Sequence, residues 1–282
     1  SKGFLIPALI LYTALFVIPC LISFGFSLTN WNSMSANIKF TGLNNFKKIF
    51  SLQGDYVAAI GHTLLFGVCT TLMKSLFGLI LALLLDNNFR SRELLRGIYF
   101  LPFAISPLII GIIFTSVLHP QWGVLNEILR AVGLDFLAKN WLVDKSIAMF
   151  SVIGVETWRE VGLNMVIFLA GLQMIDRSYY EAAEIDGAGF ISKLRYVILP
   201  LLSSSIVVNT ILNLIHGLRA FDIIFSLTGG GPGNTTEVIS TAVFRTYSAG
   251  AYGLSTALNV VVFIITAIIA ISTLKIITPK EE

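Results

Sequence analysis

The sequence predicts an all-α integral membrane protein that forms one transmembrane domain over residues 1–282. Of its 282 residues, 55% are hydrophobic and 12% are charged, and the mean hydropathy is +0.83. Soluble domains carry about 25% charged residues, so this much apolar surface indicates a lipid environment. A transmembrane helix needs about 20 apolar residues. Six stretches reach that length: Phe4–Leu28, Val57–Leu85, Ile98–Leu118, Ile147–Met174, Leu199–Leu227 and Leu254–Ile277.

Basic residues predict the orientation of these six spans. An even number of spans places both termini and the loops 86–97 and 175–198 on one side. Those segments hold eight Lys or Arg in 44 residues, and the loops of the other side hold seven in 82. Because basic loops stay in the cytoplasm, both termini are predicted to be cytoplasmic.

The first three spans contain few polar residues. The first is longer than a signal-peptide core and is interpreted as a retained span. Lys74, in the middle of the second, is predicted to pair with an acid on another helix or to extend toward an edge. Pro102 and Pro107 predict a kink in the third. Cys20 and Cys69 lie in apolar runs and are predicted to be buried free thiols.

The fourth span carries charges in the sequence "ETWRE". Glu156, Arg159 and Glu160 share one helix face, and charges within spans are usually functional. Two interpretations remain open, a salt bridge near the membrane interface or the wall of a cavity. Trp158 fits either stacking on a sugar or anchoring at the interface.

A polar segment separates the fourth and fifth spans. Ser178 and Glu181 have the spacing of a capping box, which predicts a short helix over Tyr179–Asp186 that ends at Gly187. A second helical piece follows and leads to Pro200, where the fifth span begins. An ordinary amphipathic linker is the alternative interpretation.

The fifth span has a polar stripe. Asn209, Asn213 and His216 lie within about 60° of one another on a helix. Such a stripe faces the interior of a bundle or water, and it suits either hydroxyl-rich ligands or helix–helix hydrogen bonds. Arg219 and Asp222 are predicted to form a structural ion pair.

Motifs for nucleotide binding and catalysis are absent from the sequence. The Gly-rich stretch Gly229–Thr236 lacks the Gly-Lys-Ser/Thr ending of a P-loop, so it is interpreted as an external turn. No H-E-x-x-H, G-x-S-x-G or C-x-x-C motif is present. We therefore expect no enzymatic activity, metal site or cofactor in this chain.

The polar segment also carries a family motif. "EAAEIDGAGFISKLRYVILP" resembles the EAA loop of bacterial ABC-importer permeases, which we place at about 178–200. The matching positions are Glu181, Ala182, Ala183, Gly187, Leu199 and Pro200, and Val197 replaces the usual Ile. The stretches "LPFAISPLIIGIIF", "LTGGGPGNTTEVIS" and "GLSTALNVVVFII" extend the resemblance to the maltose-type carbohydrate uptake family. This resemblance implies the type I ABC-importer permease fold and a bacterial cell membrane.

The resemblance implies a role for the EAA helix and a set of partners. Five residues would couple the chain to a cytoplasmic ATPase: Glu181, Ala182, Ala183, Asp186 and Gly187. The partners implied are a second homologous permease in a heterodimer, two ABC ATPase subunits that bind ATP and Mg, and a solute-binding protein outside. Movement of the coupling helix would drive alternating access.

The resemblance also implies a substrate pathway. The matching positions are Phe103, Pro107, Glu156, Arg159, Glu160, Leu163, Asn213, His216 and Gly217. The charged positions depart from the neutral pattern expected for a plain maltodextrin, so an acidic or modified oligosaccharide remains a candidate cargo. Arg159 and Arg219 keep glycerol-phosphate cargo open as an alternative.

Two other classes of protein are weighed against an importer subunit. An ion-coupled secondary transporter could use Glu156, Glu160 or Asp222, but such proteins commonly contain internal repeats, and none is apparent here. An integral-membrane enzyme would need catalytic motifs that the sequence lacks.

Overall fold

A computed structural model describes residues 5–34, 37–51, 55–87 and 89–277. The predicted start of the first span at Phe4 and the C-terminal residues 278–282 lie outside the described part. The α-helices are α1 (Leu5–Tyr12), α2 (Ile18–Ser27), α3 (Asn44–Ile49), α4 (Tyr56–Leu85), α5 (Arg92–Ala104), α6 (Pro107–Val117), α7 (Val124–Ala131), α8 (Ala148–Gln173), α9 (Arg177–Ile185), α10 (Phe190–Lys193), α11 (Leu199–Leu201), α12 (Ser203–Leu218), α13 (Asp222–Thr228), α14 (Ile239–Ser248) and α15 (Tyr252–Ile277). π-helical turns at Thr13–Val17 and Leu194–Ile198 join α1 to α2 and α10 to α11, and a 3-10 turn at Asp135–Leu137 follows α7.

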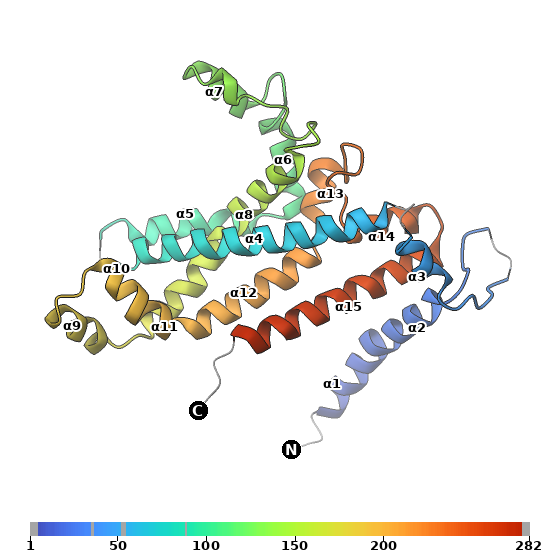
Figure 1. Ribbon diagram of the computed structural model, residues 1–282, viewed down its shortest axis with the longest axis horizontal. Coiled ribbons are helices and arrows are strands. Elements are labelled where there is room, and N and C mark those ends of the chain that lie inside the picture. The colour runs from blue at the N-terminus through green and yellow to red at the C-terminus, as the bar shows by residue number, and fades with distance from the viewer. Residues whose placement is uncertain (1–4, 35–36, 52–54, 88, 278–282) are drawn as a thin grey trace.

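Four long helices form the centre of the molecule (Figure 1). α8 packs along α4, and α12 packs between α4 and α15. Close approach of the backbones depends on small residues, as in other membrane bundles. A Cβ added to Gly217 of α12 would lie 2.8 Å from the Cα of Gly67 in α4.

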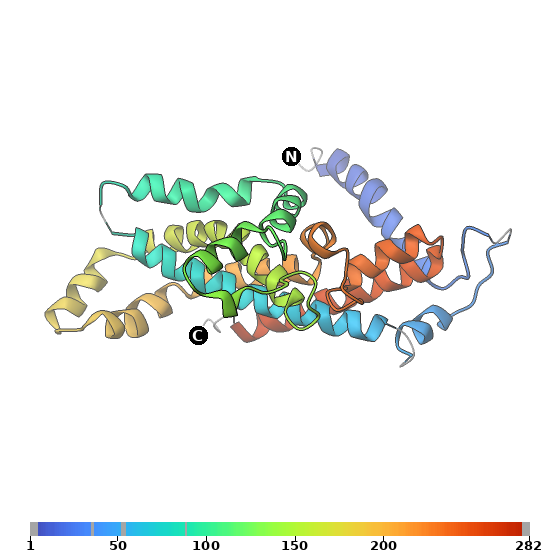
Figure 2. The same cartoon turned by 90° about the horizontal axis from the view of Figure 1, so that it is seen from above.

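The short helices lie at the two ends and along one edge of this bundle. In Figure 1, α9 and α10 occupy one end, and α3 and α14 occupy the other. α7 projects from the body beyond α6. Figure 2 shows α1 and α2 diverging from the other helices.

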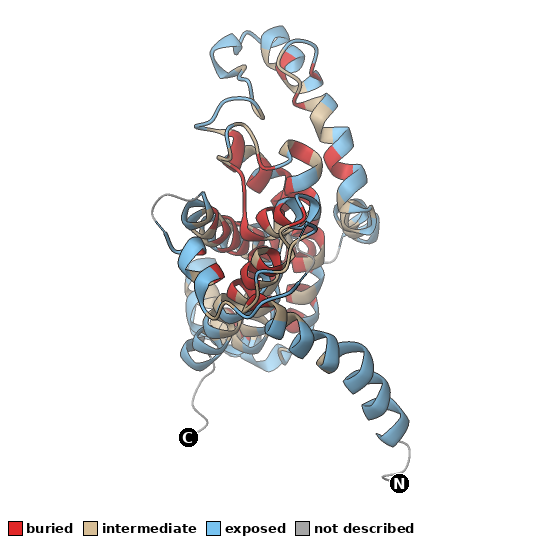
Figure 3. Cartoon of the chain, turned by 90° about the vertical axis from the view of Figure 1, so that its right-hand side faces the viewer, coloured by how far each residue is buried: buried red, intermediate tan, exposed pale blue. Residues whose placement is uncertain are grey.

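The N-terminal span is largely uncovered among the described residues, although α2 contacts α15 and its last residue, Ser27, is buried. Figure 3 shows burial concentrated in the central helices, while α1 and α2 are exposed. No residue in the most apolar window of Leu5–Ser27 is buried. Cys20 lies on this exposed surface and Cys69 is half-buried, so the prediction that both thiols are buried is wrong. Long-range packing decides burial here, and the apolar run around Cys20 contains no information about it.

Five of the six predicted spans are candidates by length and composition. Within the described residues, three single helices qualify, Leu5–Ser27, Tyr56–Leu85 and Tyr252–Ile276. Two bent pairs also qualify if each pair is one span, α5 with α6 and the segment Phe190–Leu201 with α12. α8 is 26 residues long, but Glu156, Arg159 and Glu160 reduce its apolar character.

The third and fifth spans are broken rather than continuous. α5 and α6 meet at 97°. Pro107 begins the second of these helices, so the predicted kink is a break. The fifth span ends at Leu218, not at Leu227, because α13 is a separate helix. Its residues Ile223, Ile224 and Leu227 are buried in a core cluster with Phe66 of α4. This burial turns the chain away from the direction of α12.

Candidate functional site

A cavity of about 290 Å³ lies where the broken helices meet α8. Its walls come from the start of α6, the middle of α8, the end of α12 and the start of α13. The lining residues are Pro107, Glu156, Arg159, Glu160, Ile215, His216, Arg219, Ala220, Phe221, Asp222 and Ile223. The breaks before α6 and α13 therefore place polar side chains and helix ends beside the charged face of α8.

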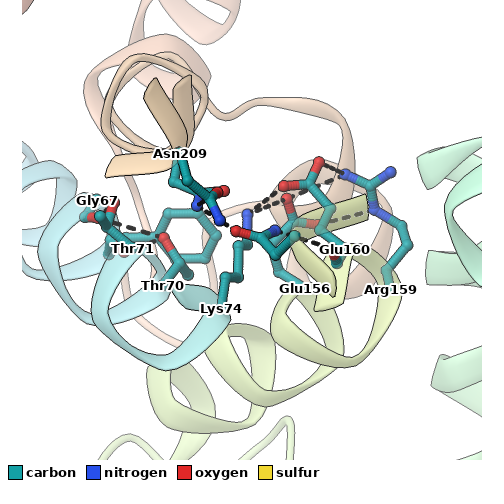
Figure 4. A network of polar contacts seen from close by, with 11 residues as sticks. Gly67, Thr70, Thr71, Lys74, Glu156, Arg159, Glu160 and Asn209 are labelled. Atoms are coloured by element: carbon teal, nitrogen blue, oxygen red, sulfur yellow. Dashed lines mark hydrogen bonds and ion pairs between the residues drawn. The ribbon is translucent and has the colours of Figure 1, made fainter. Parts of the chain in front are cut away.

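The charged residues of this wall form one buried network with Lys74 of α4 (Figure 4). Lys74 Nζ lies 3.1 Å from Glu156 Oε1 and 2.5 Å from Glu160 Oε2. Arg159 Nε donates to Glu156 Oε2 at 2.9 Å, and its Nη2 donates to Glu156 Oε1 at 3.0 Å and to Glu160 Oε1. All four carboxylate oxygens thus have a cationic donor, and the two cations balance the two anions.

The network settles two questions that the sequence leaves open. Lys74 pairs with acids of a neighbouring helix and has a fully buried side chain, so it does not extend to an edge. The charges of α8 are buried within the bundle, where they line a cavity and form ion pairs together. Trp158 instead lies on another side of α8 against Phe114, with ring centroids 5.1 Å apart.

A layer of three amides lies next to the charged network. Asn213 Nδ2 donates to Asn164 Oδ1 at 2.5 Å and to Asn209 Oδ1 at 2.8 Å. Asn164 Nδ2 in turn donates to the Glu160 carbonyl oxygen at 2.9 Å. All three amides are buried. They hold α12 against α8. Of the two interpretations of the polar stripe, Asn209 and Asn213 therefore fit helix–helix hydrogen bonding.

The structure brings only some of the predicted pathway residues to the cavity. Pro107, Glu156, Arg159, Glu160 and His216 line the cavity. Phe103 packs against Phe100, Leu163 is half-buried, and Gly217 lies against Gly67 of α4. Within the described residues no ion pair joins Arg219 to Asp222, so that prediction is wrong. The break between α12 and α13 separates the two residues from a shared helix face.

The EAA segment is a helix–turn–helix at one end of the bundle. α9 begins two residues earlier than predicted, because Asp176 is the N-cap and its Oδ1 accepts from the Ser178 backbone N–H at 2.8 Å. The predicted capping box of Ser178 and Glu181 is therefore wrong. Gly187 has φ +71°, a left-handed conformation that favours Gly, and it ends the helix as predicted.

Two electrostatic contacts lie within this segment. The hydrogen bond from the Ser178 backbone lowers the pKa of the Asp176 carboxyl below its usual value. A hydrogen bond from Lys193 lowers the pKa of Glu184, and Lys193 Nζ lies 2.8 Å from Glu184 Oε1. This ion pair links α10 to α9.

The outward surface of the EAA segment is exposed and partly apolar. Glu181, Ala182, Asp186 and Gly187 are exposed, and Ala183 is half-buried. Large apolar side chains accompany them, with Ile185 85% and Ile191 78% exposed. Single exposed apolar residues are common, but a cluster on one short segment is typical of an interaction site.

The Gly-rich stretch lies at the opposite end, where contacts with distant residues hold it. Asn234 Nδ2 donates to Asp55 Oδ2 at 2.9 Å. His62 Nδ1 lies 3.0 Å from the Glu237 carbonyl oxygen. Burial raises the pKa of the Glu237 carboxyl, which Arg245 at 3.0 Å partly offsets and Asp55 reinforces.

The chain matches known proteins over most of its length. A family model described as "Binding-protein-dependent transport system inner membrane component" matches residues 74–280. The "Probable ABC transporter permease protein YurN" of Bacillus subtilis is 34% identical and covers 99% of this chain and 96% of its own. The "Trehalose/maltose transport system permease protein MalF" of Thermococcus litoralis is 31% identical, and the match covers 96% of this chain and 91% of that protein.

A solved structure matches the fold. A chain from the crystal structure of a bacterial ABC transporter involved in the import of the acidic polysaccharide alginate superposes with a TM-score of 0.83. It is 24% identical, and the match covers 98% of this chain and 93% of that one. At this identity the likeness shows the fold alone.

The chain belongs to the family of binding-protein-dependent transport system inner membrane components. It is a transmembrane permease subunit of an ABC importer with the type I fold. The family expected from the EAA motif and the importer class expected from it are both confirmed.

Proposed function

We propose that this permease translocates an oligosaccharide by alternating access through the cavity between α6, α8, α12 and α13. The observation that carries the proposal is the lining of this cavity. Carboxylate oxygens of Glu156 and Glu160, a guanidinium group of Arg219 and the His216 imidazole meet there beside Phe221. Mixed donors and acceptors suit sugar hydroxyls, and an aromatic face suits a sugar ring.

The relatives support this class of cargo. One is named for trehalose and maltose transport, and the matching solved structure is from an alginate importer. Arg219 and Asp222 have opposite charges, and the α8 network is neutral, so the lining has no strong overall charge. A neutral sugar and a weakly acidic sugar both remain compatible with it.

Two alternatives receive less support from the same geometry. A glycerol-phosphate cargo would need free cations, and Arg159 is already paired with two carboxylates. Arg219 also lines the cavity and would be the cation left for a phosphate. An ion-coupled transporter would need a free acid in its pathway, and all four oxygens of Glu156 and Glu160 have donors. Of the three acids that line the cavity, Asp222 would remain for that role.

We propose that α9 couples this cavity to ATP hydrolysis on separate ATPase subunits. Glu181, Ala182, Ala183, Asp186 and Gly187 would form the docking surface, with exposed Ile185 adding apolar area. ATP and Mg would bind to the ATPase subunits and not to this chain. The end with α9 would then be cytoplasmic, as would both termini, and the Gly-rich stretch would face the solute-binding protein.

The proposed complex also contains a second homologous permease. The exposed surfaces of α1 and α2 would lie against lipid or this partner.

The test is sugar-stimulated ATPase activity of the purified complex in lipid nanodiscs, with the binding protein and a panel of neutral and acidic oligosaccharides. We expect one class of sugar to stimulate hydrolysis. Glu181→Lys should remove the stimulation or release the ATPase subunits. Glu127→Lys is the matched control, because it reverses an exposed acid on α7 at a distance from α9.

Two results would contradict the proposal. Normal stimulation and normal retention of ATPase subunits in Glu181→Lys would remove α9 from the coupling role. Transport driven by a proton or sodium gradient, without an ATPase subunit, would favour a secondary transporter.

A further inference from the structure

The buried lysine of α4 contacts two residues of the cavity wall without lining the cavity itself. Lys74 has no exposed side-chain surface and is not among the residues that line the cavity. Its Nζ nevertheless bonds to the two carboxylates that do line it, at 3.1 Å and 2.5 Å. In Figure 4 the ammonium group points from α4 toward Glu156 and Glu160.

Arg159 alone leaves the wall incompletely paired. Its guanidinium reaches both oxygens of Glu156 but only Oε1 of Glu160. Glu160 Oε2 receives its donor from Lys74. Without Lys74 the wall would carry two carboxylates against one guanidinium, and its net charge would be about −1.

This difference would matter for what enters the cavity. A carboxylate in a partly desolvated cavity attracts cations and repels anions over several ångströms. Paired carboxylates keep their remaining lone pairs as hydrogen-bond acceptors without that field. A neutral wall therefore accepts sugar hydroxyls while it does not concentrate metal cations.

We propose that Lys74 is a positioning residue that sets the charge selectivity of the translocation cavity by neutralising the second carboxylate of its wall. It acts through Glu160 and Glu156 and does not contact cargo. The inference rests on the proposed function only in treating this cavity as part of the pathway.

The electrostatic character of the cavity can be measured without knowing the cargo. The two cysteines of the chain are replaced by serine, Cys20→Ser and Cys69→Ser, and Ile215→Cys places one thiol in the cavity wall. The complete complex is then labelled with a cationic and an anionic methanethiosulfonate reagent. The ratio of the two rates reports the local potential, because the opposite charges of the reagents respond to it in opposite directions.

In Lys74→Met we expect the ratio of cationic to anionic labelling to rise about tenfold, as the loss of one charge at close range in a partly desolvated site implies. Lys74→Arg should leave the ratio unchanged, because it keeps the charge. Lys74→Met combined with Glu160→Gln restores neutrality and should return the ratio to within about twofold of the parent.

A purely structural role for Lys74 gives a different pattern. Looser packing changes both labelling rates in the same direction and leaves their ratio constant, and that result would overturn the proposal. If Lys74→Met alone does not assemble, the charge-balanced double variant compared with Glu160→Gln alone decides the question. Glu160→Gln leaves a surplus cation, so its ratio should fall below the parent, and equal ratios in the two variants would also overturn the proposal.

The result of the labelling experiment can be distinguished from the result of the sugar-stimulated ATPase test. The labelling needs no sugar and no hydrolysis, so a complex that no sugar stimulates still tests Lys74. Equally, a constant labelling ratio would leave sugar-stimulated hydrolysis and its dependence on Glu181 intact.

Discussion

Replacing one glycine of α8 tests the packing that holds the cavity wall in place. A Cβ at Gly162 would lie 2.7 Å from the Cα of Phe100 in α5 and would collide with the backbone carbonyl group of Tyr99. The obstructing atoms belong to the backbone, so no side-chain rotation relieves the clash. Gly162→Ala therefore forces the two helices apart.

The size of the effect follows from this distance. Ordinary contact between carbon atoms begins at 3.4 Å, and the added Cβ would lie 2.5 Å from the Tyr99 carbonyl carbon and closer still to its oxygen. The helices must therefore separate by about 0.9 Å or more. A gap of that size loses about a quarter to a half of the dispersion attraction between facing atoms. Overpacked cores lose about 1–3 kcal/mol, and we expect Gly162→Ala near the upper end.

The measurement is the thermal unfolding midpoint of the purified complex, followed by intrinsic fluorescence. Gly154→Ala is the matched control, since it makes the same change in the same helix where nothing lies within 4 Å of the added Cβ. Alanine favours a helix over glycine by about 1 kcal/mol, so this control should raise the midpoint or leave it unchanged. A Gly162→Ala midpoint equal to or above that of the parent would refute the packing argument.

Three further predictions concern the EAA segment and the amide layer. Asp176→Ala should speed hydrogen exchange of the first turn of α9. In the parent protein the same faster exchange should appear on acidification. The Ser178 hydrogen bond lowers the pKa of Asp176, so the stabilisation by this cap is lost as the pH falls through that lowered pKa. Unchanged exchange in Asp176→Ala would contradict the role of Asp176 as the cap. Gly187→Ala should destabilise the turn after α9 by about 1–2 kcal/mol through its φ of +71° alone, and Gly187→Asn should destabilise it less. Both effects are measured as changes in the stability of the assembled complex. Equal destabilisation by the two variants would contradict the conformational explanation. Asn213→Leu leaves acceptors such as Asn164 Oδ1 without a donor and should cost about 1–3 kcal/mol in thermal unfolding, whereas a stabilised variant would show that the amide layer is dispensable.

The EAA segment was accessible from the sequence because its signals are local. The positive φ at Gly187 and the position of Pro200 at the start of α11 follow from residues within one or two turns. The cap was misassigned within the same segment, since Asp176 and Ser178 are both good N-caps and only the backbone path selects between them. The docking roles of Glu181 and its neighbours stay predictions.

The cavity shows what local patterns leave undecided. The sequence placed Glu156, Arg159 and Glu160 on one face of α8, because helical periodicity fixes relative angles within a helix. It left the partner of Lys74 open, because 82 residues separate it from Glu156. A charge in the middle of a span was the only signal, and it required an acid on some other helix.

By itself, the sequence determined that this protein spans a membrane with long apolar helices, that it carries the EAA motif of its family, and that charges and amides lie on particular faces of α8 and α12. These properties follow from composition and from periodicity along a single helix. The tertiary structure decided that the third and fifth spans are broken and that Lys74 completes the ion pairs of the cavity wall. Burial of Ile223, Ile224 and Leu227 beside Phe66 requires that second break. Such choices depend on contacts between residues far apart in the chain, and their free energies exist only once the helices have packed together.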